Sequence, residues 1–338
     1  MTGEEVTRLL PMEECVDVMA SALRALCLGE GVQPVRSVLR LPDGSGLLGV
    51  MPSYLGPDAG STAGAAPSMA AHLGLKVITV MPGNHGTPYD SHQGAVLLFE
   101  ADHGRLIAIA DASAVTRTRT AAVSAAATRV LANPDADDLA ILGSGVQAAA
   151  HVVAMRAVRP IARVRVWSRS ADSARRFASE AAARTGIPVE PAPDARAAVR
   201  GASIICTTTA ASDPVLLGEW IAPGAHVNAV GACTPAAREL DTDAMRRATL
   251  FVDDRAAAVA EAGDLLIPIR EGAVTQDHIA ATLGEVLTGA HPGRRARGEI
   301  TLFKSLGLAV EDLAAAARLY ANALATGAGT RIRLGGLR

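Results

Sequence analysis

Three cations in the first third of the sequence have the residue type and the setting for chemistry on a carboxylate. Arg36 lies in QPVRSV and Lys76 in LGLKVITV, both apolar and strand-like, and Arg119 lies in VTRTRTAAVSA. A cation within an apolar run needs a paired anion or the carboxylate of a ligand. Two interpretations follow: long side chains whose stems cover apolar surface, or a carboxylate clamp beside a catalytic lysine.

The stretch LAILGSGVQ, residues 139–147, is typical of a loop that binds a dinucleotide. A short apolar run breaks into Gly143, Ser144 and Gly145, and Ala148 then completes the pattern G-x-G-x-x-A. The first glycine allows a sharp turn, and the second lets backbone N–H groups approach a pyrophosphate at a helix N-terminus. The alternative is an ordinary strand-turn-helix junction in an Ala-rich chain.

The tip of the next predicted strand, VRVWSRS at residues 164–170, bears on the choice of dinucleotide. NAD sites usually place Asp or Glu there, about 20 residues after the glycines, to bind the ribose 2′-hydroxyl. This sequence has Ser168, Arg169 and Ser170, and a guanidinium flanked by hydroxyls suits a 2′-phosphate. We therefore predict NADPH, with NADH as the alternative cofactor. A solvated loop charge is the other interpretation of Arg169.

The elements that must position these residues fall into two groups. In the first group, helical spacing predicts a helix over residues 11–28, and β-rich runs predict strands at 35–40, 46–51, 73–81, 94–100 and 106–111. This mixture indicates an α+β domain. An Ala-rich helix over residues 113–131 carries Arg119 near its beginning and leads to the second group.

From residue 139 onward strands alternate with helices, which is typical of a parallel sheet. After the strand that begins at 139, further strands are predicted at 164–170, 203–209, 226–231 and 250–253, with a helix at 171–185. Ligands of such sheets bind off the carboxyl ends of the strands, so residues 207–209 and 230–233 are predicted to face the cofactor. Residues 301–324 predict one long helix that returns to the first domain.

Composition argues against several classes of function. The 338 residues are 49% hydrophobic and 20% charged, enough for two globular domains. A net charge of −2 and 3% aromatic residues argue against nucleic acid and anionic membranes as partners. With no apolar run near the roughly 20 residues that span a bilayer, and no leader, we expect a cytoplasmic protein. The four cysteines and eight histidines show no metal-ligand spacing, so no metal is predicted.

The chain resembles, over nearly its whole length, the ornithine cyclodeaminase and mu-crystallin family, and is most similar to the mu-crystallin branch. The segments that carry the resemblance are QPVRSV, GLLGVMPSY, GLKVITV, SHQGAVLLFE, RTAAVSAAAT, ILGSGVQA, VRVWSRS, GEWIAPGAHVNAVGA and TLFKSLGLAVED. The resemblance implies a Rossmann-type NAD(P)-binding domain, residues 121–302, inserted in a substrate-binding and dimerisation domain, residues 1–120 plus 303–338. It also implies a homodimer in which Arg36, Lys76 and Arg119 face an amino-acid-like substrate.

One departure from the family pattern affects the expected reaction. The cyclodeaminases carry an Asp in the loop after the strand that resembles HVNAVG, and this sequence has Cys233 there. A thiol with an ordinary pKa of about 8.5 is a poor substitute for a carboxylate that binds an amine. The resemblance to the mu-crystallin branch, which also lacks that Asp, favours reduction of a ketimine by a nicotinamide cofactor. For Cys233 itself, a role as a small packed side chain is favoured over a role as a nucleophile.

We therefore predict an NAD(P)H-dependent reductase of an α-imino acid, reversible as an amino-acid dehydrogenase. Arg36 and Arg119 would hold the carboxylate while hydride reaches the C=N carbon. Lys76, whose pKa the two guanidinium groups would lower, would hydrogen-bond the substrate and relay a proton. The alternatives are an ornithine or lysine cyclodeaminase that releases ammonia, and a protein that binds NADPH and a small ligand with little turnover.

The predicted site residues form two sets. The substrate set is Arg36, Lys76, Arg119 and Cys233. The cofactor set is His92, Arg119, Gly143, Ser144, Gly145, Val146, Gln147, Ser168, Arg169, Ser170, Thr207, Thr208, Val230, Gly231 and Lys304. For His92 an exposed turn residue is the alternative. The loops at residues 53–70 and 232–240 are expected to set the pocket size, so the sequence names no single imino acid.

Overall fold

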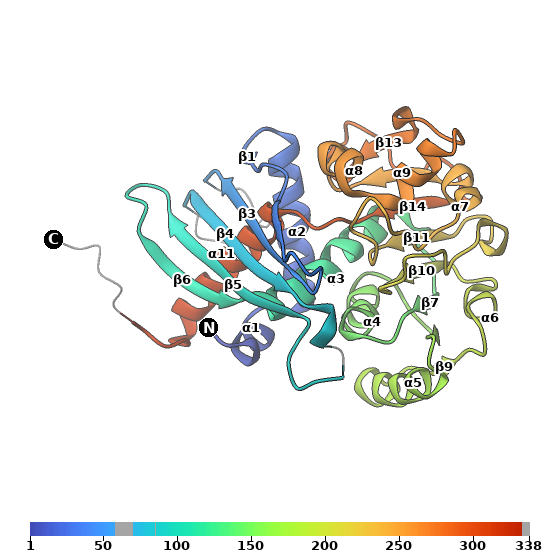
Figure 1. The fold of residues 1–338 in the computed structure, drawn as a ribbon, viewed down its shortest axis with the longest axis horizontal. Coiled ribbons are helices and arrows are strands. Elements are labelled where there is room, and N and C mark those ends of the chain that lie inside the picture. The colour runs from blue at the N-terminus through green and yellow to red at the C-terminus, as the bar shows by residue number, and fades with distance from the viewer. Residues whose placement is uncertain (58–69, 85, 333–338) are drawn as a thin grey trace. The chain divides into compact units, whose positions relative to one another are not determined.

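The computed structural model describes residues 1–57, 70–84 and 86–332, and the chain divides into two compact units (Figure 1). The first unit is Met1–Arg119 with Leu308–Arg338, and the second is Thr120–Gly307. The boundaries expected from sequence lie after residues 120 and 302. Most of the predicted pocket loop, residues 58–69, and the last six residues of the predicted first domain lie outside the described residues.

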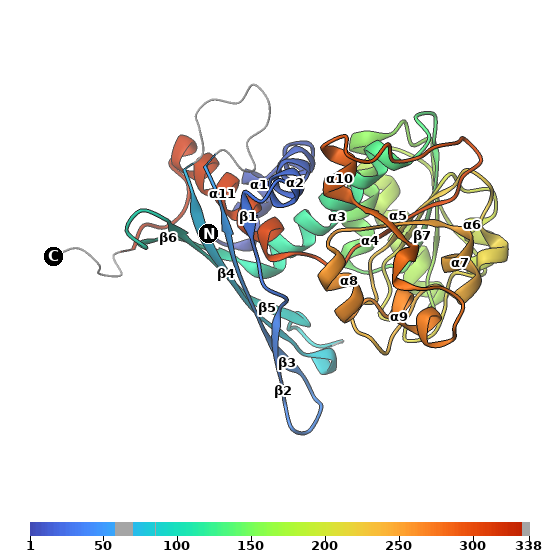
Figure 2. The ribbon, with the colours of Figure 1, turned by 90° about the horizontal axis from the view of Figure 1, so that it is seen from above.

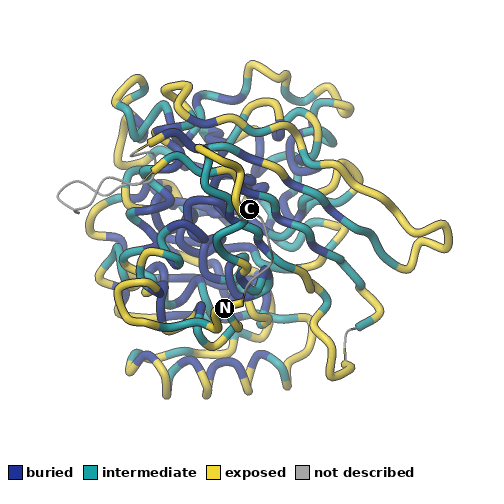
Figure 3. Tube along the Cα trace, turned by 90° about the vertical axis from the view of Figure 1, so that its left-hand side faces the viewer, coloured by how far each residue is buried: buried dark blue, intermediate teal, exposed yellow. Residues whose placement is uncertain are grey.

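An antiparallel sheet of six strands forms the centre of the first unit. Its order is β1 (Gly31–Val32), β3 (Leu47–Leu55), β4 (His72–Val80), β5 (His92–Glu100) and β6 (Leu106–Asp111), and β2 (Ser37–Arg40) pairs with β3 beyond this path. The hairpin of β2 and β3 extends past the other strands (Figure 2), and its tip, residues 41–45, is exposed throughout (Figure 3). The predicted α+β character of this part is confirmed.

Three helices accompany this sheet: α1 (Gly3–Leu9), α2 (Met12–Cys27) and α11 (Ala309–Thr326). Helices α2 and α11 lie side by side against one face of the sheet (Figures 1 and 2). Burial alternates along the strands, as the period of two in a strand requires. In β4, Lys76 and Ile78 are buried, whereas Leu75 and Val77 are only half-buried. The side chain of Lys76 therefore belongs to the face that α11 covers.

The second unit contains a parallel sheet of eight strands in the order β13-β12-β14-β11-β10-β7-β8-β9. The strands are β7 (Asp138–Leu142), β8 (Arg163–Trp167), β9 (Val189–Pro191), β10 (Ile204–Thr207), β11 (His226–Ala229), β12 (Thr249–Val252), β13 (Ile279–Thr282) and β14 (Thr301–Lys304). From β7 the chain moves outward to β8 and β9, and then returns to β10 on the other side. This order is that of a doubly wound dinucleotide-binding fold, so the predicted fold class is confirmed.

Helices connect these strands, and helix α3 (Ala112–Leu131) begins in the first unit and ends in the second. The others are α4 (Val146–Val158), α5 (Ala171–Thr185), α6 (Ala195–Val199), α7 (Thr242–Arg247), α8 (Arg255–Glu261), α9 (Gly263–Arg270) and α10 (Leu283–Leu287). Single 3-10 turns occur at Pro82–Asn84, Gly218–Trp220 and Gln276–His278. Within the described residues, no helix has the length and apolar character needed to cross a membrane.

One element of the sequence analysis is wrong: residues 301–324 are not a single helix. Thr301–Lys304 form strand β14, which pairs with β11 and β12, and the helix α11 begins only at Ala309. The β-branched and aromatic residues Thr301 and Phe303 favour a strand, and Gly307 turns the chain with φ of 78° before the helix. Because β14 belongs to the parallel sheet, the second unit continues to Gly307.

Candidate active site

Lys76 lies in the middle of β4, and its side chain is 4% exposed. Its Nζ donates to both carboxylate oxygens of Asp312, at 3.2 Å and 3.1 Å. Asp312 stands in the first turn of α11, and the neighbouring strand β3 holds the start of this helix because the Ser53 hydroxyl donates to the carbonyl of Ala309 (3.1 Å). The sequence therefore places a buried ammonium next to a buried carboxylate, the pairing that such a charge requires.

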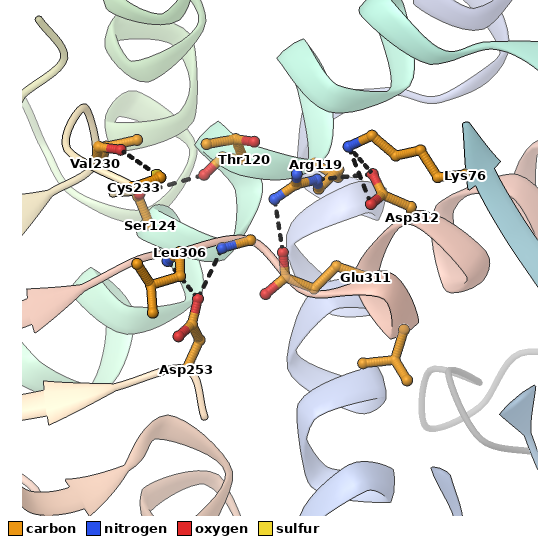
Figure 4. Close-up of polar contacts among 12 residues, drawn as sticks. Lys76, Arg119, Thr120, Ser124, Val230, Cys233, Asp253, Leu306, Glu311 and Asp312 are labelled. Carbon is orange, nitrogen blue, oxygen red and sulfur yellow. Dashed lines mark hydrogen bonds and ion pairs between the residues drawn. The ribbon is translucent and has the colours of Figure 1, made fainter. Parts of the chain in front are cut away.

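Arg119 extends the same cluster from helix α3. Its Nε donates to Asp312 Oδ1 and its Nη1 to Glu311 Oε2, both at 2.9 Å. Figure 4 shows the two adjacent carboxylates of α11 with the Lys76 and Arg119 side chains turned toward them. All four side chains are at most 5% exposed. Two buried cations and two buried anions thus form one network whose formal charges cancel.

Burial and neighbouring charges shift the proton affinities in this network. Burial lowers the pKa of Lys76 to about 8; Asp312 opposes the shift, and Arg119 and Arg36 reinforce it. The pKa of Asp312 lies below its usual range because Arg119 and Lys76 outweigh the effect of burial. The predicted lowering of the Lys76 pKa is confirmed, although burial contributes more to it than the two guanidinium groups. Lys76 can therefore gain or lose a proton near neutral pH.

Arg36 and His92 lie near this network in the same unit. Arg36 is half-buried in the segment between β1 and β2, close enough for its charge to lower the pKa of Lys76. His92 is the first residue of β5, and its Nδ1 is 3.0 Å from the Ser91 hydroxyl. His92 is exposed at the surface, and partial desolvation together with the charge of Lys76 lowers its pKa. The structure thus brings Arg36, Lys76, His92 and Arg119 into one neighbourhood.

Sequence reasoning missed the two acids, Glu311 and Asp312. They follow Lys76 by more than 230 residues, and no local pattern links them to it. The available signal was their setting: two adjacent carboxylates near the start of an Ala-rich helix, immediately before the apolar run LAAAA. Such charges on a buried helix need cations from elsewhere in the fold.

In the second unit, the glycine loop after β7 has the geometry of an anion-binding turn. Gly143 has φ of 114°, and a Cβ there would stand 2.7 Å from the Thr208 carbonyl oxygen, so a side chain does not fit. Gly145 is the N-cap of α4 and offers no side chain to its N–H groups, and the space around its Cα is open. Backbone N–H groups at an accessible helix N-terminus suit a pyrophosphate. The residues present therefore fit a dinucleotide.

The remaining predicted cofactor residues of this unit gather at the same edge of the sheet. The Ser144 hydroxyl donates to the Ser168 hydroxyl at the end of β8 (2.9 Å), and Arg169 beside it is exposed. The others are Val146 and Gln147 in the first turn of α4, Ser170 as the N-cap of α5, Thr207 and Thr208 at the end of β10, and Val230 and Gly231 after β11.

Lys304 and Cys233 have partners inside the second unit. The Lys304 ammonium is fully buried, pairs with Asp264 at 3.0 Å and donates to the Ala229 carbonyl at 3.3 Å. Burial opposes its charge, but Asp264, Cys233 and Glu239 together outweigh that effect and raise the pKa of Lys304. The Cys233 thiol donates to the Val230 carbonyl at 3.5 Å. Direct contact of either side chain with cofactor or substrate stays a prediction.

Comparisons with known proteins agree with this geometry. The sequence model of the ornithine cyclodeaminase/mu-crystallin family matches residues 1–327. The ketimine reductase mu-crystallin of Mus musculus is 43% identical over 292 residues, which are 86% of this chain and 85% of that protein. The Thermococcus litoralis Δ1-pyrroline-2-carboxylate reductase, solved with NADH and L-proline, superposes with a TM-score of 0.92 at 33% identity, covering 98% of this chain and 99% of that one. An archaeal alanine dehydrogenase dimer with bound NAD superposes with a TM-score of 0.89 at 31% identity, covering 99% of this chain and 98% of that one.

Proposed function

This chain belongs to the ornithine cyclodeaminase/mu-crystallin family, and from that membership and the geometry above we propose that it is an NAD(P)H-dependent reductase of an α-imino acid. It converts the C=N bond of a ketimine to the amine of an amino acid, and acts in reverse as an amino-acid dehydrogenase. The observation that carries the proposal is the buried network in which Lys76, with a pKa near 8, is bonded to Asp312 beside Arg119.

Charge explains why the substrate carries a carboxylate. Lys76 and Arg119 balance Glu311 and Asp312, so the network itself is formally neutral. Arg36 adds one positive charge within electrostatic range of Lys76. A guanidinium binds a carboxylate through two parallel hydrogen bonds, which also fix the orientation of the bound molecule. We therefore assign Arg36 and Arg119 to the substrate carboxylate and Lys76 to the imine nitrogen.

Lys76 handles the proton of the reaction. The reduced nicotinamide, when bound, supplies the hydride that adds to the imine carbon, and the nitrogen needs one proton to become the amine. The Lys76 ammonium donates a hydrogen bond to that nitrogen, which withdraws electrons from the C=N bond and favours attack on carbon. Asp312 holds the Nζ in place and keeps it protonated at neutral pH.

We assign the cofactor to the second unit and the substrate to the first. The N–H groups around Gly145 would hold the pyrophosphate, and the end of β8 would receive the adenosine ribose. Ser168, Arg169 and Ser170 stand there in place of an acid, which favours NADPH over NADH. The contacts of His92, Arg119 and Lys304 with the cofactor are part of the same proposal.

The protein is further proposed to be a homodimer. The face of the first sheet opposite α2 and α11 presents Leu75, Val77, Leu97 and Phe99, all half-buried. An antiparallel sheet whose outer face meets water carries polar residues there, so an apolar face indicates a partner. A second copy is the occupant we favour, because the archaeal neighbour is a dimer. Sedimentation at micromolar concentration tests this assembly. The cytoplasmic location stays a prediction from sequence.

The test of the reaction is oxidation of NADPH and NADH, followed by absorbance, with a panel of α-imino acids. The panel contains five- and six-membered cyclic ketimines, an open-chain imine formed from an oxo acid and an amine, and iminosuccinate. Ammonia release from ornithine and lysine is assayed in parallel. Imine-dependent oxidation of the cofactor is the expected result. Ammonia without net cofactor oxidation would instead establish a cyclodeaminase, and bound cofactor without turnover would indicate a binding protein.

A further inference from the structure

A fully buried carboxylate, Glu239, connects the ends of two neighbouring parallel strands. Its Oε2 accepts hydrogen bonds from the Thr207 hydroxyl (2.7 Å), at the end of β10, and from the Gly231 N–H (2.6 Å), just after β11. Its Oε1 accepts from the Thr209 N–H (2.6 Å) and the Thr209 hydroxyl (2.7 Å). One buried carboxylate thus accepts four hydrogen bonds, and these fix the two strand-end segments relative to each other.

A second acid and a lysine hold Glu239 itself. Asp264, in the first turn of α9, accepts from the backbone N–H groups of Glu239 (2.8 Å) and Leu240 (3.0 Å). Lys304, from β14, pairs with Asp264 (3.0 Å) and also donates to the carbonyl of Ala229, the last residue of β11. The network therefore joins the carboxyl ends of β10, β11 and β14, which are consecutive strands of the sheet.

Closing two loops with such a network has a high desolvation free energy, because the network contains buried charges. Removing two carboxylates and one ammonium from water is unfavourable, and their mutual attraction offsets that desolvation only with good geometry. In proteins generally, apolar side chains of similar volume often stabilise a fold as well as a buried ion pair does. A buried polar network is instead suited to fixing one arrangement of the backbone, because any displacement leaves a donor or an acceptor unpaired.

The packing around Glu239 shows how closely that arrangement is defined. A Cβ on Gly231 would stand 2.0 Å from the Thr209 carbonyl oxygen and 2.6 Å from Glu239 Oε1. On its other side, the turn that contains Thr208 lies against Gly143 of the glycine loop. Residues 207–209 are therefore enclosed between two glycines, and Glu239 is the acid that anchors them.

The strand order assigns these segments to one half of the cofactor. In a doubly wound sheet the dinucleotide crosses the point where the order reverses, which here lies between β7 and β10. The pyrophosphate turn follows β7, and the ribose tip follows β8, so the adenosine half lies on the β8 side. The nicotinamide half then lies over the ends of β10 and β11, where Thr207, Thr208, Val230 and Gly231 stand.

We propose that Glu239, supported by Asp264 and Lys304, is a positioning residue that fixes the backbone supporting the nicotinamide half of the cofactor. It acts through residues 207–209 and Gly231 and does not itself touch the cofactor. This inference rests on the proposed function, because it takes NAD(P)H as the ligand of this sheet edge.

The test compares the whole cofactor with a fragment that lacks nicotinamide. In Glu239→Gln the amide oxygen can still accept from Thr209, but the amide nitrogen would face the Gly231 N–H, which cannot accept. Leaving a buried donor unpaired predicts about a tenfold weaker Kd for NADPH and a kcat lowered by a similar factor. The Kd of 2′-phospho-ADP, which lacks both the nicotinamide and its ribose and so contacts only the adenosine side, is expected to change by less than about twofold.

Two further variants separate positioning from general stability. Thr209→Val removes one of the four hydrogen bonds with little change of shape and is expected to shift the NADPH Kd in the same direction by a smaller factor. Glu299→Gln is the matched control: that carboxylate accepts from the Thr249 hydroxyl (2.6 Å) at the amino end of β12, the opposite edge of the sheet. It is expected to leave both dissociation constants and kcat unchanged. Thermal unfolding is measured for every variant.

The outcomes distinguish this inference from the proposed function. If NADPH and the fragment weaken by the same factor in Glu239→Gln and Thr209→Val, Glu239 is merely structural, and the inference is wrong. Unchanged Kd values and kcat would also overturn it. A wild-type chain that binds neither NADPH nor NADH would overturn the cofactor assignment on which both rest. Selective loss of the nicotinamide contribution supports the inference.

Discussion

Replacing Asp312 with Asn is expected to move the alkaline limb of the pH–rate profile to lower pH. Asp312 bonds Lys76 through both carboxylate oxygens and is the neighbour that raises the pKa of this lysine against its burial. Asn keeps the shape and one acceptor but removes the negative charge. If Lys76 must be protonated for imine reduction, kcat/KM falls as pH rises through the Lys76 pKa. In Asp312→Asn this fall begins at a lower pH than in the wild type.

The size of the effect follows from the geometry. An opposite charge at hydrogen-bond distance changes a pKa by about one to three pH units. With a wild-type value of about 8, Lys76 is about nine-tenths protonated at pH 7. A drop of about two units leaves roughly a tenth protonated, so kcat/KM at pH 7 falls about tenfold and recovers toward about pH 5. Asp312→Asn also weakens the contact between Asp312 and Arg119. That change is expected to lower kcat/KM equally at every pH, without moving the alkaline limb of the profile.

The assay is kcat/KM for imine reduction between about pH 5 and 9, with Glu311→Gln as the matched control. Glu311 bonds Arg119 through Nη1, whereas Asp312 is the neighbour that contributes most to raising the pKa of Lys76. The Glu311→Gln variant is expected to raise KM for the imino acid while the alkaline limb stays near pH 8. An Asp312→Asn profile that is lower at all pH values but keeps the wild-type limb would refute the role assigned to Lys76.

Three further outcomes follow from the site. Lys76→Met is expected to lose turnover by at least about 100-fold without loss of cofactor binding; turnover near the wild-type rate would contradict the proton donor. Arg169→Ala is expected to weaken NADPH binding by about 10- to 100-fold while the Kd of NADH, measured by its fluorescence, stays constant. Gly143→Ala forces a Cβ to 2.7 Å from the Thr208 carbonyl at φ of 114°, so calorimetry should show destabilisation by more than about 1 kcal/mol, together with weaker binding of both cofactors.

The parts of the site that sequence could predict are those that a local pattern encodes. The glycines at 143 and 145 and the serine and arginine at the end of β8 have fixed spacings that reflect the geometry of the bound dinucleotide. Arg36 and Lys76 stood out because a charge within an apolar segment needs a partner, and Arg119 stood out near the beginning of an Ala-rich helix. The resemblance to a known family added the assignment of these cations to a carboxylate.

The partners of those charges could not be predicted, because they come from distant parts of the chain. Asp312 reaches Lys76 across 236 residues and Arg119 across 193. Glu239 lies in the loop 232–240, which was expected to shape the pocket and to present Cys233, and the role of Glu239 depends on how β10 and β11 end side by side. The strand β14 was mistaken for a helix because its four residues precede a long helical pattern, and only the pairing with β11 and β12 decides its conformation.

The pairing of Lys76 and Arg119 with α11 also constrains the order in which the protein can fold during synthesis. The second unit is one continuous segment, Thr120–Gly307, and can complete its sheet as soon as β14 has left the ribosome. Residues 1–119 of the first unit leave the ribosome earlier, but the acids of α11 that neutralise Lys76 and Arg119 have not yet been made at that point. We expect the inserted segment, Thr120–Gly307, to reach its native state first. The N-terminal part, although synthesised earlier, is expected to remain partly unfolded until α11 is made, in a form that chaperones can bind.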